Sequence, residues 1–162
     1  MRYRLDFFTV TAICASVLDA LTTFCFIVTG TGSEMNTALS PLIEHSLAWI
    51  FIYILSRPLI IPLLPDLSRL VFAVYFLTVC LVFAINNFWG IVNGDYFATR
   101  ILGFHGVHAL ACVTSALAYS YHCVANFVTL TDWIRNTIWL FVFNGLFAAI
   151  EWVFVWIGSL LG

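Results

Sequence analysis

Long apolar runs dominate this chain, and each is about as long as a helix that crosses a membrane. Only 9% of the 162 residues are charged, against roughly 25% in soluble domains. A helix satisfies its own backbone hydrogen bonds inside lipid. We therefore expect an all-α transmembrane bundle, residues 1–162, with about five spans in a single domain. The expected spans are residues 7–29, 39–56, 67–92, 101–123 and 133–161.

Prolines interrupt the apolar stretch that follows the second expected span. Pro58, Pro62 and Pro65 lie within eight residues, and proline removes a backbone donor and disfavours a continuous helix. We expect residues 58–65 to form a shallow interfacial or re-entrant connection rather than a span.

The distribution of arginine predicts the orientation. With the N-terminus inside, five of the six arginines fall on the cytoplasmic side and only Arg100 lies outside, as the positive-inside rule favours. The cytoplasmic arginines are Arg2, Arg4, Arg57, Arg69 and Arg135. The net charge is −2, and no basic patch is present, so nucleic acid is not expected as a partner.

A polar stripe runs along the fourth expected span. Its members recur at steps of three and four residues, which places them on one face of a helix. They are His105, His108, Cys112, Ser115, Tyr119, His122 and Asn126. We expect the other helices of the bundle to close around this stripe.

Histidines near the predicted outer side form a candidate cofactor site. His105 and His108 are one turn apart, and His45 lies at a similar depth in the second span. Together with Glu44 or Asp95 they could hold zinc or copper, and a b-type haem between His45 and one of the other two is also consistent. Hydrogen bonding between buried histidines and neighbouring helices is the structural alternative.

Acidic and amide side chains form a second candidate set. Asp19, Glu34 and Asn36, joined by Glu151 from the last span, offer the oxygen ligands that suit a hard cation or a proton relay. In the structural alternative, Thr23, one turn after Asp19, satisfies the carboxyl group and the set fixes helix packing.

The segment 18–23, which contains Asp19 and Thr23, followed by Gly30, Glu34 and Asn36, resembles a family of small prokaryotic membrane proteins, domain of unknown function 5658. The resemblance covers about residues 10–60. It implies a multi-pass protein of the prokaryotic inner (cytoplasmic) membrane and carries no activity with it.

No catalytic motif is recognisable, since G-x-S-x-G, H-E-x-x-H and glycine-rich phosphate loops are all missing from the sequence. We therefore predict no catalytic residues and a non-enzymatic role as a small subunit of a larger membrane complex, in contact with lipid and other membrane-protein subunits. One alternative is a metal- or haem-binding redox protein that uses His45, His105 and His108. A second is a cation or proton carrier that uses Asp19 and the loop residues Glu34 and Asn36.

Overall fold

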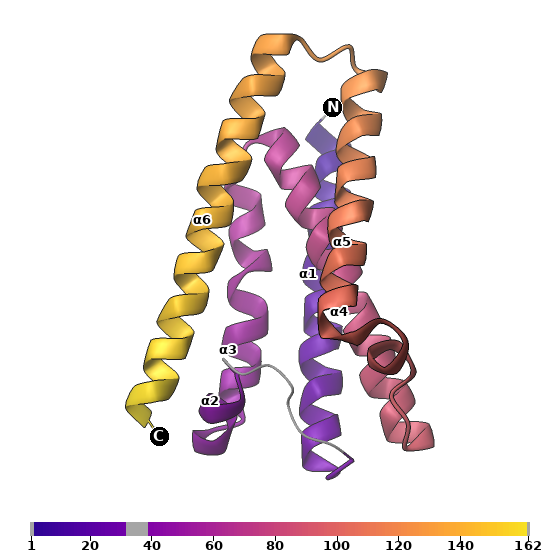
Figure 1. Ribbon diagram of the computed structural model, residues 1–162, viewed down its shortest axis with the longest axis vertical. Helices are drawn as coiled ribbons and strands as arrows, with labels where there is room; N and C mark the ends of the chain where they lie inside the picture. The colour runs from indigo at the N-terminus through magenta and orange to yellow at the C-terminus, as the bar shows by residue number, and fades with distance from the viewer. Residues whose placement is uncertain (1, 32–38, 162) are drawn as a thin grey trace.

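All regular structure in the described part of the chain, residues 2–31 and 39–161 of this computed structural model, is helical. The elements are α1 (Arg2–Val28), α2 (Ser40–His45), α3 (Ala48–Ser56), the 3₁₀ helix η1 (Pro58–Leu63), α4 (Asp66–Asn93), α5 (Phe97–Ala125) and α6 (Leu130–Leu161). The long helices follow a common axis, and the two termini lie near opposite ends of it (Figure 1). The predicted all-α fold is confirmed.

Three helices of the described residues are long and apolar enough to cross a membrane, namely Phe7–Val28 within α1, Asp66–Asn93 and Leu130–Leu161. About 20 apolar residues in a helix match the thickness of a bilayer core. The segment Ala48–Leu63 is apolar but shorter. These three helices are compatible with a membrane protein. The five spans and the N-terminus on the inside remain predictions.

The contact between α1 and α4 is the most extensive in the molecule. On the α1 side it is built from small residues four apart, Ala12, Ser16 and Ala20, all of them fully buried. Small side chains let two helices approach closely, which favours their association in lipid. The next polar positions on this helix, Asp19 and Thr23, are buried as well, so the packing of α1 places both side chains inside the bundle.

The expected second span, residues 39–56, is not one helix. It divides at Ser46, whose extended backbone (φ −162°, ψ 131°) ends α2 before α3 begins. The three prolines that follow belong to a connection in which Pro58 and Ile61 are buried. The expected fourth span is also interrupted, because Gly103 within α5 has a non-helical backbone (φ 66°, ψ 169°).

Helix α6 packs less closely than the other long helices. Only 12% of its most apolar window is buried, against 39% for α1 and for α4. Below the loop that joins them, α6 leans away from α5 and runs beside α2 and α3 (Figure 1). Two ring contacts, Phe147 with Phe72 and with Phe76, tie it to α4. This arrangement leaves space between α6 and the rest of the bundle.

Candidate functional site

The candidate site is a cavity of about 1070 Å³ between α6 and the rest of the bundle, lined by residues of α1, α3, α4, α5 and α6. Ten of the thirty described lining residues are aromatic. The aromatic lining residues are Phe26, Tyr53, Phe72, Tyr75, Phe76, Phe83, Tyr96, Tyr119, Phe141 and Phe147. Small-molecule sites commonly have volumes of about 300–1,000 Å³, apolar walls and a few placed polar groups. The cavity is large enough for an organic ligand.

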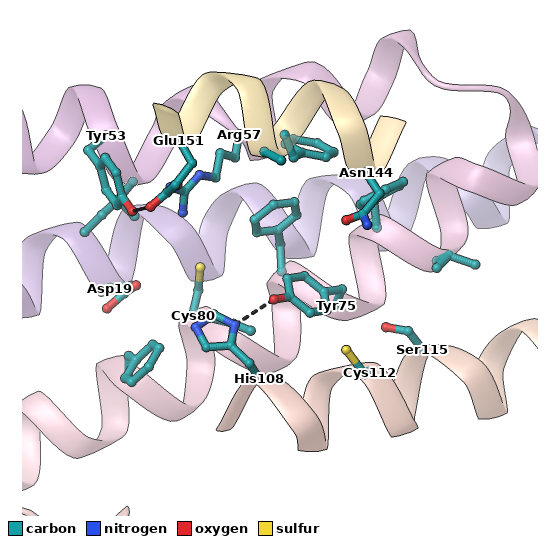
Figure 2. A pocket seen from close by; sticks show the side chains of 18 of the residues that line it. Asp19, Tyr53, Arg57, Tyr75, Cys80, His108, Cys112, Ser115, Asn144 and Glu151 are labelled. Carbon is teal, nitrogen blue, oxygen red and sulfur yellow. Dashed lines mark hydrogen bonds and ion pairs between the residues drawn. The ribbon is translucent and has the colours of Figure 1, made fainter. Parts of the chain in front are cut away.

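One wall carries an ion pair that connects α3 with α6. The Arg57 guanidinium pairs with one carboxylate oxygen of Glu151, and the Tyr53 hydroxyl donates a hydrogen bond to the other. Tyr53 and Arg57 are four residues apart, so they lie on the same face at the end of α3, and the Arg57 Cζ atom lies 4.1 Å from the centre of the Tyr53 ring. Figure 2 shows this triad on one side of the cavity.

A tyrosine–histidine pair occupies the opposite wall. The Tyr75 hydroxyl of α4 and Nδ1 of His108 of α5 are 2.6 Å apart, which is a close hydrogen bond. The rings of Tyr75 and Phe83 have their centres 6.0 and 6.1 Å from that of His108. In Figure 2, His108 lies across the cavity from Arg57, on the same side as Asp19. The pair joins α4 to α5 and holds the imidazole at the cavity surface.

Asp19 forms the polar end of the cavity together with side chains from α1 and α4. The Thr23 hydroxyl donates to Asp19 Oδ1 at 3.4 Å, and the Asn87 amide donates to the Thr23 hydroxyl at 2.9 Å. Asp19 is only 6% exposed, and all three side chains line the cavity. The chain of donors holds the carboxyl group in place.

Ser115 adds a buried hydroxyl group that can still form a hydrogen bond. Its side chain is 4% exposed, it lines the cavity, and its hydroxyl has no hydrogen-bond partner among the described residues. In Figure 2 the Ser115 hydroxyl points toward the side of the cavity that holds Tyr75. Buried hydroxyls are normally hydrogen-bonded, so a bound molecule or water is the expected partner.

The structure separates the predicted metal or haem ligands. His45 ends α2 and contacts the Leu161 carbonyl at the end of α6, and its neighbour Glu44 is exposed. His108 faces Tyr75, and exposed Asp95 pairs with Arg100. His105 is exposed on α5 and does not line the cavity. Among the side chains that the structure describes, no three His, Cys, Asp or Glu residues are grouped to hold a metal ion. The break at Ser46, which assigns His45 to the short α2, is the physical reason.

The predicted acidic set is brought together in part. Asp19, Thr23 and Glu151 all line the cavity, although they come from opposite ends of the sequence. Glu34 and Asn36 fall outside the described residues.

Sequence reasoning missed the partners of Glu151. The arginine distribution predicts that Arg57 lies at the cytoplasmic boundary, and it predicts no role for Tyr53. The available signal was the spacing of these two residues on one helical face, together with a carboxylate in an otherwise apolar helix. Such a carboxylate normally has a partner in the bundle interior.

No known protein family, curated protein or solved structure matches this chain. The resemblance to domain of unknown function 5658 stays a prediction that rests on the residues of the first helix and the following loop.

Proposed function

We propose that this protein binds a small, largely apolar organic molecule within the membrane, in the cavity between α6 and the rest of the bundle. The observation that carries the proposal is the cavity itself, with about 1070 Å³ of space and mostly apolar walls that include ten aromatic residues. An apolar space of this size with a few placed polar groups is typical of small-molecule sites.

The polar groups support a defined occupant rather than lipid chains alone. Ionisable side chains within a bilayer are costly, and they usually mark functional sites. Here Asp19, Glu151, Arg57 and His108 share a single cavity, each anchored to another helix or by a neighbour. A site that only accommodated acyl chains would not need them.

Saturable photolabelling with a neutral alkyl-diazirine probe in lipid nanodiscs tests the proposal. Labelling of cavity residues should saturate with probe concentration, whereas labelling of lipid-facing residues should rise linearly. Ala148→Trp should abolish the saturable part, because Ala148 lines the cavity. Ala149→Trp is the matched control, since Ala149 is exposed like Ala148 but is not part of the lining. Linear labelling at every position in the parent protein would refute the proposal.

The prediction of an accessory subunit is independent of the cavity. The exposed apolar face of α6 is what contact with lipid requires, and it favours no particular protein partner. Stoichiometric co-purification of another membrane protein in mild detergent would support that prediction, and a monomer under the same conditions would count against it.

A further inference from the structure

The hydroxyl group of Ser115 lies in the cavity wall without a hydrogen-bond partner among the described residues. A serine inside a helix commonly donates to the carbonyl oxygen four residues earlier, as Ser16 does to Ala12 at 2.8 Å. Ser115 makes no such bond, although only 4% of it is exposed. Its donor and its acceptor are therefore both available to a molecule in the cavity.

A second neutral polar side chain, Asn144, lines the cavity from α6. In Figure 2 its amide group points from the α6 wall toward the wall that holds Ser115. The hydroxyls of Tyr119 and Thr137 are 3.5 Å apart, which sets the antiparallel helices α5 and α6 in register. Ser115 lies four residues before Tyr119, about 6 Å along α5, and Asn144 lies about 10.5 Å past Thr137 along α6. The two side chains differ by about 4.5 Å in depth, so both can contact the polar end of one ligand.

We propose that the cavity binds an uncharged amphiphile, a molecule with an apolar body and one hydroxyl group, and that Ser115 and Asn144 bind this hydroxyl. This inference rests on the proposed function and specifies the chemical class of its ligand. A hydroxyl group both donates and accepts hydrogen bonds, and so do the serine hydroxyl and the asparagine amide. The ligand can therefore accept a hydrogen bond from one side chain and donate one to the other.

The ionisable side chains of the cavity are engaged within the protein, which favours an uncharged ligand. These contacts join Arg57 with Glu151, His108 with Tyr75, and Asp19 with Thr23. A charged head group would have to compete with them, and it would also lose its hydration on entering the bundle. A hydroxyl group loses less hydration free energy, and hydrogen bonds to Ser115 and Asn144 would offset that loss.

Selectivity for such a ligand depends on the polar contacts rather than on the apolar body. Lipid tails are as apolar as the apolar side chains of a helix bundle, so the body gains little when it leaves the bilayer for the cavity. A hydrogen bond to a buried group that otherwise lacks a partner changes affinity by about tenfold. The Ser115 hydroxyl should therefore distinguish an alcohol from an alkane of the same length.

Competition for the saturable photolabelling of the cavity tests the inference, with four competitors that share one dodecyl chain. They are 1-dodecanol, dodecane, dodecyltrimethylammonium and dodecanesulfonate. The protein is held in nanodiscs of neutral lipid, and each competitor is measured as its mole fraction in the lipid, so that differences in partitioning do not enter. In the parent protein, dodecanol should displace the neutral probe at a mole fraction about tenfold lower than dodecane or either charged compound.

Variants of the two polar residues assign the preference to them. Ser115→Ala should make dodecanol as weak a competitor as dodecane and leave dodecane unchanged, which also shows that the variant is folded. Asn144→Leu should likewise weaken dodecanol alone. The matched control is Ser120→Ala, since Ser120 also lines the cavity but is exposed, and it should preserve the preference for dodecanol.

Equal competition by dodecanol and dodecane in the parent protein would overturn the inference and leave the binding of an apolar molecule intact. A preference for dodecanol that persists unchanged in Ser115→Ala would do the same, as would stronger competition by either charged compound. A parent protein without saturable labelling would instead refute the proposed function, and this inference with it.

Discussion

The ion pair between Arg57 and Glu151 should contribute measurably to the attachment of α6. Exposed ion pairs contribute about 0–1 kcal/mol, whereas removing one partner of a fully buried pair costs about 3–5 kcal/mol. The two side chains are 18% and 38% exposed, which places this pair between those limits. We therefore expect a coupling free energy of about 2 kcal/mol between Arg57 and Glu151.

A double-mutant cycle isolates this quantity. Arg57→Gln and Glu151→Gln should each lower the free energy of unfolding by about 2 kcal/mol, and the double variant should lose about 2 rather than 4 kcal/mol. The assay is unfolding by sodium dodecyl sulfate from mild detergent micelles, followed by the fluorescence of the six tryptophans.

An ion pair formed within α6 provides the control. Arg135 and Asp132 are 2.7 Å apart, but their side chains are 66% and 41% exposed. The cycle of Arg135→Gln and Asp132→Asn should give a coupling below about 0.5 kcal/mol. If the Arg57–Glu151 coupling were no larger than this, the ion pair could not be what attaches α6, and the reasoning would be refuted.

Three further substitutions should have effects that the same unfolding assay can measure. Gly94→Ala should lower the free energy of unfolding by about 1 kcal/mol, because Gly94 ends α4 in the left-handed region (φ 69°), where alanine is strained. Gly145→Ala should leave the free energy of unfolding unchanged, because Gly145 lies at a helical position with open space around it. Tyr75→Phe should lower the free energy of unfolding by about 1 kcal/mol, because it removes the hydrogen bond to His108. An unchanged midpoint of the unfolding transition would contradict this. Ser115→Ala should be neutral or stabilise by up to about 1 kcal/mol in ligand-free protein, since it removes a buried hydroxyl without a described partner.

Helix boundaries were predictable where the sequence supplies a local signal. The start of α4 at Asp66 follows Pro65, and its end precedes Gly94, whose positive φ closes the helix. The break at Ser46 carries no such signal, because neither glycine nor proline stands there. Its extended backbone reflects the packing of α2 against α6, a long-range contact that no local pattern reveals.

The polar stripe of α5 was predictable in its centre and not at its ends. His108, Cys112, Ser115 and Tyr119 line the cavity, whereas His105 and the two last members, His122 and Asn126, do not. Steps of three and four average 3.5 residues, so a stripe drifts by about 20° per heptad around a straight helix of 3.6 residues per turn. Over three heptads the drift reaches about 60°, or about 30° from the centre to either end, which rotates the end residues away from the direction that the centre faces.

The ion pair between Arg57 and Glu151, which joins the end of α3 to α6, could not be predicted from the sequence, because it depends on how far a side chain extends. Charge counting assigned Arg57 to the membrane boundary and hydropathy assigned Glu151 to the interior, which appeared to separate them in depth. A long arginine side chain can place its charge well away from its own Cα atom. The tilt of α6, visible in Figure 1, brings Glu151 within that reach.

The same ion pair links the attachment of α6 to the charge of the cavity. Apolar surface gives no net driving force between helices in lipid, so specific contacts must fix the position of α6. Around Glu151 these contacts include Phe154, whose ring packs 5.0 Å from that of Tyr53. Because Glu151 also neutralises Arg57, its removal would both loosen α6 and leave a cation in the wall. Glu151→Gln should therefore lower the unfolding free energy. If that free energy stayed unchanged, the ion pair with Arg57 would not be what fixes the position of α6.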